Sequence, residues 1–213
     1  DVTDWLLSHY GRPGCDELEA AWRDGRIGSR ECMGGQIALL DPSQDDIDAL
    51  LDGIEIDPDF VAFVHFAQAR GMPVQIVSDG LDYAIHRILH RHGVHGLPVL
   101  ANRLERVGER RWTLLFPHGA PHCVKRSGHC KCATLAGQQH RWNRTLYIGD
   151  GASDFCVSGK VDLVLAKAKL IDHCRNHGMA HEAFAGFDQV LALCRTLLAP
   201  QSDAVLLGEA AAP

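Results

Sequence analysis

One octapeptide sets the architecture of this chain, Tyr147-Ile148-Gly149-Asp150-Gly151-Ala152-Ser153-Asp154. The segment 144–148, rich in β-branched and aromatic side chains, predicts a short buried strand that ends at Gly149. Asp150 therefore follows a strand directly, and Asp154 lies four residues further on. In open α/β sheets, ligands bind beyond the carboxyl ends of the strands. We therefore expect a binding site at this loop.

The two acids of the loop fit two interpretations. Gly-Asp-Gly is ordinary turn chemistry, which would leave both carboxylates solvated. Alternatively, carboxylates on a glycine-containing loop suit Mg²⁺, which prefers one or two carboxylates together with water and phosphate oxygens. Motifs elsewhere in the chain favour the magnesium site.

Length and composition place the chain among ordinary globular proteins. Its 213 residues, 46% of them hydrophobic, can form one or two domains without disulfide bonds. The net charge of −6 argues against a general nucleic-acid-binding surface, although a local positive pocket can still bind an anionic substrate. No apolar run reaches the length of a membrane span. Eight cysteines in such a chain predict reduced thiols and a cytoplasmic protein.

The hydrophobic pattern divides the chain into three parts. Residues 1–55 contain four short helical segments with no strand between them, which predicts a small helical cap subdomain. Across residues 56–199 helical and strand patterns alternate, which indicates an α/β fold with a Rossmann-like, doubly wound parallel sheet. The tail, 200–213, is predicted to be disordered.

The individual elements follow from periodicity and from turn residues. The expected strands are 74–77, 98–104, 111–116, 145–149 and 161–166, the second and third paired around Gly108. The expected helices are about 3–10, 15–23, 29–40, 43–51, 59–70, 81–92, 131–140, 152–158, 167–177 and 187–198.

A second candidate loop, Ser78-Asp79-Gly80, follows the strand 74–77. A hydroxyl and the N–H groups of a glycine-containing turn at a helix start can hold a phosphate group. Ser78 can equally well be a plain helix N-cap.

Lys131 lies where the helix 131–140 is predicted to begin. The positive end of the helix dipole makes this an unusual place for a lysine, unless the side chain faces an anion. Phosphoryl transfer requires positive charge close to the phosphate oxygens, which a lysine together with Mg²⁺ supplies. The alternative is a lysine that points into solvent.

These motifs, in this order on consecutive βα units, resemble those of the haloacid dehalogenase superfamily of phosphohydrolases. Ser78 matches the second motif of that family, Lys131 the third, and Asp150 with Asp154 the fourth. The helices of residues 1–55 resemble the small cap of the phosphoserine phosphatase-like branch. Further stretches resemble the methionine-salvage-type phosphatases of that branch: Asp1–Asp4, Arg26–Cys32, Val77–Gly80, Ala101–Leu104 and Ser127–Cys132.

The resemblance implies a Mg²⁺-dependent phosphomonoesterase that acts on a small phosphorylated metabolite through an aspartyl-phosphate intermediate. Ser78, Lys131 and Asp150 would be catalytic. Ser78, Lys131 and the backbone of Asp79 and Gly80 would bind the phosphate group. Asp150 would hold the metal ion, and Asp154 would ligate through water or orient the ligands. The cap would exclude water and select the leaving group.

One family motif has no counterpart in the sequence. The first motif, Asp-x-Asp at the end of the first strand, supplies the nucleophile and the general acid and base. Asp1 and Asp4 have the wrong spacing and no strand before them. We expect the motif to precede residue 1, and we expect residues 1–213 alone to be unstable and nearly inactive. The alternatives are a catalytically silent relative that binds a phosphorylated ligand or a partner, and a phosphoserine phosphatase-like enzyme.

Three weaker signals remain open. The loop 118–132 is rich in cysteine and histidine and either binds zinc or exposes solvated side chains. In the cap, Arg26, Arg30 and Glu31 are either substrate contacts or surface charges. Asn102 and Arg103 are either structural or line the site.

Overall fold

The computed structural model describes residues 2–138, 141 and 143–198 of the chain. Asp1, the end of the predicted helix 131–140 and the predicted disordered tail 200–213 lie outside these residues.

The N-terminal part is helical, as predicted. It consists of α1 (Val2–Tyr10), α2 (Cys15–Arg23), α3 (Ser29–Ala38) and α4 (Gln44–Asp52), which we call the helical region. Ser43 caps α4: its hydroxyl accepts a hydrogen bond from the N–H of Asp46, and the Asp46 carboxylate accepts one from the Ser43 N–H. Local turn chemistry therefore sets where this helix begins.

The strands of the described residues form two three-stranded sheets. The first contains β1 (Ile76–Leu81), β2 (Val99–Arg106) and β3 (Trp112–Leu115), with β1 parallel and β3 antiparallel to β2. The second contains β4 (Leu146–Gly149), β5 (Leu163–Ala166) and β6 (His181–Ala183), all parallel. The five predicted strands are present, and β6 is an addition. The parallel strands are thus distributed over two sheets, and β1 and β4 each pair along one edge only with a described strand.

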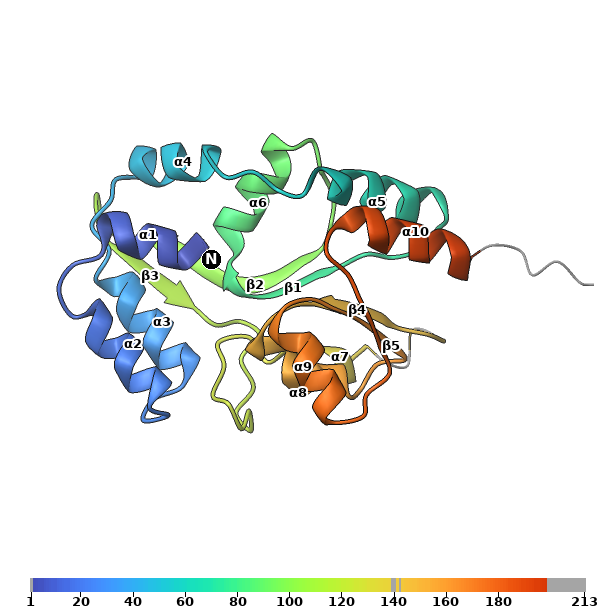
Figure 1. Cartoon of the computed structure of the whole chain (residues 1–213). Helices are drawn as coiled ribbons and strands as arrows, with labels where there is room; N and C mark the ends of the chain where they lie inside the picture. The colour runs from blue at the N-terminus through green and yellow to red at the C-terminus, as the bar shows by residue number, and fades with distance from the viewer. Residues whose placement is uncertain (1, 139–140, 142, 199–213) are drawn as a thin grey trace, which may run out of the picture.

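Helices cover the second sheet on both faces, as a doubly wound arrangement requires. The remaining α-helices are α5 (Pro58–Ala69), α6 (Asp82–Arg91), α7 (Lys131–Ala136), α8 (Phe155–Ser158), α9 (Lys169–Asn176) and α10 (Phe187–Leu197), and the short 3-10 helix η2 (Ala152–Asp154) precedes α8. Leu165 on β5 packs into a cluster with residues of α5 and α10, which lie side by side (Figure 1). Its neighbours Val164 and Ala166 pack against α8 and α9. The alternation of side chains along β5 therefore separates two apolar clusters.

A third apolar cluster joins the helical region to the first sheet. Leu6, Ile37 and Ile47 of the helical region pack in it with Leu104 of β2 and Trp112 of β3, and all five side chains are buried. The helical region therefore shares its core with the β2–β3 hairpin, which fixes its position relative to the strands.

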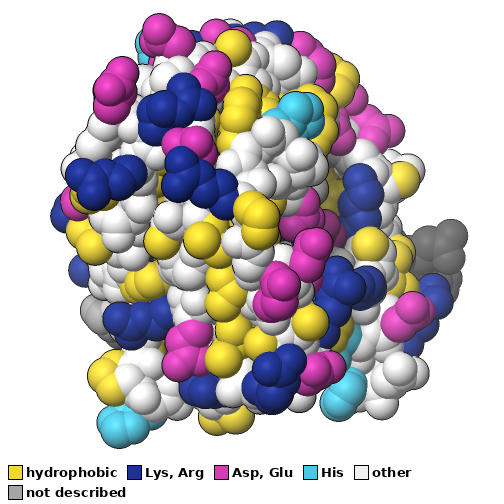
Figure 2. Space-filling model, turned by 90° about the vertical axis from the view of Figure 1, so that its left-hand side faces the viewer, with side chains coloured by type: hydrophobic (Ala, Val, Ile, Leu, Met, Phe, Trp, Pro, Cys, Tyr) yellow, Lys and Arg dark blue, Asp and Glu magenta, His cyan; other side chains and the backbone are white. Residues whose placement is uncertain are grey.

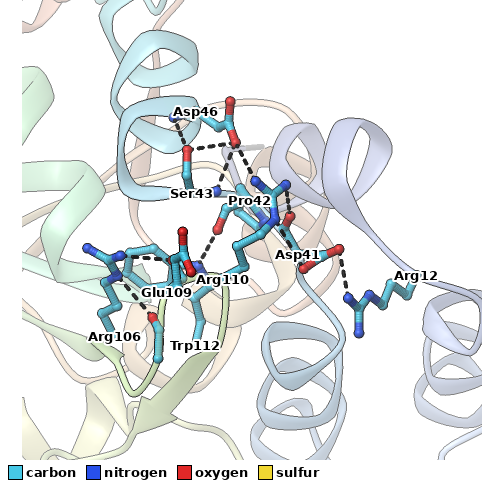
Figure 3. Close-up of polar contacts among 10 residues, drawn as sticks. Arg12, Asp41, Pro42, Ser43, Asp46, Arg106, Glu109, Arg110 and Trp112 are labelled. Atoms are coloured by element: carbon cyan, nitrogen blue, oxygen red, sulfur yellow. Dashed lines mark hydrogen bonds and ion pairs between the residues drawn. The ribbon is translucent and has the colours of Figure 1, made fainter.

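Polar contacts reinforce this joint at its rim (Figure 3). The Trp112 indole N–H donates to the carbonyl oxygen of Pro42 at 3.0 Å. Arg110, on the hairpin turn, pairs with the carboxylates of Asp41 and Asp46, and Arg12 of the helical region pairs with Asp41 at 2.7 Å. The hairpin is thus held by an apolar core and by ion pairs around it.

The outer surface of the helical region is mixed in character. Figure 2 shows acidic and basic side chains interspersed with apolar ones on this side of the molecule. In the part of the chain that the structure describes, no helix combines the length and the apolar character that crossing a bilayer requires.

The shared cluster leads to a prediction about stability. Ile37 is fully buried in the cluster, so Ile37→Ala should lower the free energy of unfolding by about 2–5 kcal/mol through lost burial and the cavity that remains. Val107, on the hairpin turn, is 55% exposed, and Val107→Ala should change the free energy of unfolding by less than about 0.5 kcal/mol. Urea unfolding of both variants measures the difference. Equal effects would contradict a core shared between helices and hairpin.

Candidate active site

The predicted loop 78–80 lies within β1, which corrects the sequence prediction. Val77 pairs with Leu100 and Leu81 with Asn102, so the register shifts between these two pairs. The intervening backbone leaves the regular ladder, which is the physical reason why these residues are available for other contacts. The Gly80 N–H donates to the Ser78 hydroxyl at 3.0 Å. Ser78 is not a helix cap, because α6 begins at Asp82.

Lys131 is the first residue of α7 and is buried, with 9% of its surface exposed. Its ammonium Nζ lies 2.5 Å from Oδ1 of Asp154 and 3.0 Å from the Ser153 hydroxyl. The interpretation as a lysine that points into solvent is therefore wrong. The ammonium faces the loop that follows β4, as the anion-facing interpretation requires.

Asp154 organises this loop through both of its carboxylate oxygens. Oδ1 also accepts a hydrogen bond from the Tyr147 hydroxyl at 2.7 Å, and Oδ2 accepts from the N–H groups of Asp150 and Gly151 at 2.9 and 3.0 Å. A Cβ atom at Gly149 would lie 2.7 Å from Oδ2, so only glycine fits there. The side chain of Asp154 is thus committed to holding the loop.

The protonation states of this cluster follow from burial and charge. Burial alone would raise the pKa of Asp154, but the Lys131 ammonium and the hydrogen bonds to the carboxylate hold that pKa below its ordinary value. Burial, and then the Asp154 carboxylate, raise the pKa of the Tyr147 hydroxyl. At neutral pH the cluster therefore contains an ionised Asp154 and a protonated Tyr147.

Asp150 differs from Asp154 in its exposure. It directly follows Gly149, the last residue of β4, and it is exposed, whereas Asp154 is 3% exposed. A free hard carboxylate at a strand end is the donor that Mg²⁺ takes together with water and phosphate oxygens. Asp150 is therefore the carboxylate of this loop that is available to a magnesium ion, because both oxygens of Asp154 already accept hydrogen bonds.

Hydrogen bonds connect the three predicted segments. Oδ1 of Asp79 accepts from the His129 N–H at 2.7 Å, so the irregular part of β1 touches the turn before α7. The contact of Lys131 with Asp154 joins α7 to the loop after β4. The three segments are therefore contiguous, and their joint action on a phosphate group stays a prediction.

The open question about Asn102 and Arg103 has a structural answer. Asn102 is fully buried, and its side-chain amide donates to the carbonyl oxygen and the carboxylate of Asp79 at 2.6 and 3.0 Å. Arg103 is exposed and pairs with Glu105 at 2.8 Å. Asn102 thus holds Asp79 in place, and Arg103 is a surface residue.

The charged residues of the helical region have local partners. Arg26 pairs with Asp24 at 3.1 Å, and the Glu31 carboxylate accepts from the Gly28 N–H at 3.1 Å at the start of α3. The guanidinium of Arg30 lies over the Phe116 ring, 5.1 Å from its centroid. These contacts account for Arg26 and Glu31 as surface and capping residues.

The loop 118–132 contains free thiols and one buried imidazole. All eight cysteines, each among the described residues, are free, and the Sγ atoms of Cys130 and Cys132 are 3.5 Å apart. Within the described ranges, no group of three or more His, Cys, Asp or Glu residues is arranged to hold a metal ion. His129 is 2% exposed, its Nε2 lies 2.8 Å from the Thr134 hydroxyl, and burial lowers its pKa to about 4.

Sequence reasoning missed three residues around the Lys131 ammonium and the Asp79 carboxylate. Tyr147 and Ser153 lie within the octapeptide that carries Asp150, so their proximity to Asp154 was a usable signal. Ser29 carries no signal, because its contact with Asp79 joins residues 50 positions apart.

Comparison with known proteins places the chain among phosphohydrolases. A model of the haloacid dehalogenase-like hydrolase family matches residues 10–158. The 2-hydroxy-3-keto-5-methylthiopentenyl-1-phosphate phosphatase of Exiguobacterium sp. is 30% identical over 88% of this chain and 87% of that protein. The phosphatase of the same name from Brevibacillus brevis is 28% identical over 87% and 85%. A probable phosphoserine phosphatase from Vibrio cholerae superposes with a TM-score of 0.65 at 19% identity, over 86% of this chain and 56% of that chain. This last likeness shows the fold alone.

The buried imidazole predicts acid sensitivity. In the unfolded chain a histidine protonates near pH 6.5, whereas folded His129 protonates only at about pH 4. Between these values the unfolded state binds more protons, so stability falls as the pH falls through this window. His129→Gln should flatten the decline of the melting temperature between about pH 6.5 and about pH 4. The exposed control His122→Gln should follow the wild type, and parallel curves for all three proteins would contradict the account.

Proposed function

The chain belongs to the haloacid dehalogenase-like hydrolase family, and among the phosphatases of that family we propose that it is a Mg²⁺-dependent phosphomonoesterase of a small phosphorylated metabolite. The observation that carries this proposal is the position of Lys131. Its ammonium is buried and is held at a loop whose other acid, Asp150, is exposed at the end of β4. A cation held against a loop that carries a free carboxylate suits a phosphate ester and a divalent ion.

Each proposed site residue has a distinct role. Ser78 and the N–H groups of Asp79 and Gly80 bind phosphate oxygens, since they lie in the irregular part of β1. The Gly80 N–H would exchange its bond to the Ser78 hydroxyl for one to the phosphate group. Lys131 neutralises charge on the phosphate group as it is transferred. Asp154 and Ser153 keep the ammonium in place before substrate arrives.

Asp150 holds the metal ion in this proposal, and the Asp154 carboxylate orients the loop around it. When bound, Mg²⁺ stabilises the negative charge that develops on the phosphoryl oxygens. The N–H of Asp150 donates to Oδ2 of Asp154, and the Asp150 side chain is exposed.

The nucleophile in this proposal is an aspartate on a strand supplied by sequence before Asp1. Two observations support this placement. β1 and β4, which carry or precede the proposed site residues, each have one edge that no described strand pairs with. Both oxygens of the buried Asp154 accept hydrogen bonds, so this carboxylate is not available as a nucleophile. An upstream reading frame that encodes Asp-x-Asp supports the enzyme, and its absence favours a catalytically silent relative.

For the substrate class, the curated relatives favour 2-hydroxy-3-keto-5-methylthiopentenyl-1-phosphate over phosphoserine, because they carry that name at 28–30% identity. A panel of phosphomonoesters containing both compounds, assayed with Mg²⁺ and with EDTA, separates the two.

The proposal makes a direct prediction for the full-length protein. Asp150→Asn and Lys131→Ala should each lower phosphatase turnover by more than about a hundredfold. The first substitution removes the negative charge that binds the metal ion, and the second removes the positive charge that faces the phosphate group. Lys125→Ala and Asp188→Asn, at exposed positions, are the matched controls and should retain turnover. Near-normal turnover of either site variant would refute the assignment.

A further inference from the structure

The carboxylate of Asp79 connects three segments that are distant in sequence. Its Oδ2 accepts from the Ser29 hydroxyl at 2.8 Å, and its Oδ1 accepts from the His129 N–H at 2.7 Å and the Asn102 amide at 3.0 Å. Ser29 begins α3 of the helical region, Asn102 lies on β2, and His129 belongs to the turn before α7. One half-buried side chain thus touches the helical region, the first sheet and the segment that carries Lys131.

The packing around Asp79 is tight on the side of the turn. A Cβ atom at Gly128 would lie 2.8 Å from Oδ1 of Asp79 and 2.7 Å from the Phe116 ring. Glycine at this position therefore lets the His129 N–H reach the carboxylate. The turn cannot move away from β1 without losing this hydrogen bond.

The turn that contains Gly128 and His129 leads directly to Lys131. His129 precedes it by two residues, and its imidazole is anchored on the Thr134 hydroxyl of α7. The path from the Asp79 carboxylate to the Lys131 ammonium therefore runs through one buried peptide segment with hydrogen bonds at both ends. Because close-packed interiors deform little, a shift of His129 would carry over to Lys131.

We propose that Asp79 is a positioning residue: its side chain fixes the turn that places Lys131 and ties the turn to Ser29, so that the lysine is in place when α3 is in place. This rests on the proposed function and extends it, since Asp79 was otherwise assigned only through its backbone. The three donors are neutral, so the geometry of the acceptor matters more than its charge. The Ser29 bond couples the helical region, which shares its core with the hairpin, to the phosphate-binding cation.

Hydrogen exchange of the full-length protein tests the structural half of this proposal. In Asp79→Ala the segment 126–131 should exchange at least about tenfold faster, because the His129 N–H loses its acceptor. Asp79→Asn keeps an acceptor oxygen and should exchange more slowly than Asp79→Ala. The control Asp82→Ala removes a comparable bond, from the Leu104 N–H at 2.9 Å, and should leave 126–131 at the wild-type rate. Unchanged exchange in Asp79→Ala would overturn the proposal.

Steady-state kinetics test the functional half. Asp79→Ala should lower kcat at least about tenfold, and Asp79→Asn should restore most of that loss, because Lys131 is again in place. Ser29→Ala breaks only the bond to the helical region; it should raise KM at least about threefold while kcat changes less than about twofold, since substrate binding must then order α3. The proposal would be overturned if kcat of Asp79→Asn were as low as that of Asp79→Ala. It would also be overturned if Ser29→Ala and Asp79→Ala lost kcat equally.

The exchange and the kinetic experiments together distinguish a failure of this inference from a failure of the proposed function. If the wild type hydrolyses no phosphomonoester, the proposed function fails, and the exchange experiment still tests whether Asp79 fixes the turn. If Asp79→Ala does not fold, Asp79→Asn and Ser29→Ala supply the exchange and kinetic comparisons.

Discussion

The structure depends on one buried ion pair, between the ammonium of Lys131 and the carboxylate of Asp154. Burying a charge is costly unless it is paired and hydrogen-bonded, and both partners here meet that condition. Asp154 accepts from a hydroxyl and two backbone N–H groups in addition to the ammonium. The pair therefore closes the loop after β4 and fixes the start of α7. The exposed Asp150 is left free for other chemistry.

The fold supports this pair from both sides. Parallel pairing of β4 with β5 ends at Gly149 and Ala166, and the acidic loop begins at that edge. On the other side, Asp79 holds the turn before Lys131 and contacts Ser29 of the helical region. The helical region is itself fixed by the core around Ile37 and Trp112. Packing far from the site thus determines where the lysine lies.

Local patterns predicted the elements and the position of Lys131, because a helix start, a strand end and a glycine turn are encoded within a few residues. The register irregularity around Ser78 was not predictable, since it depends on how β1 pairs with a strand about twenty residues away. The strand β6, His181–Ala183, is too short and too polar to give a periodic signal. The contact of Ser29 with Asp79 depends on how the helical region packs on the sheet, which no local pattern reports.

We propose that Ser78, Lys131 and Asp150 act on one phosphate group. A crystal structure of the full-length protein with Mg²⁺ and orthovanadate tests it most directly. We expect vanadate oxygens within about 2.7–3.2 Å of the Lys131 ammonium and the Ser78 hydroxyl, with the metal ion bound by Asp150. Vanadate and metal bound away from these three side chains would contradict it.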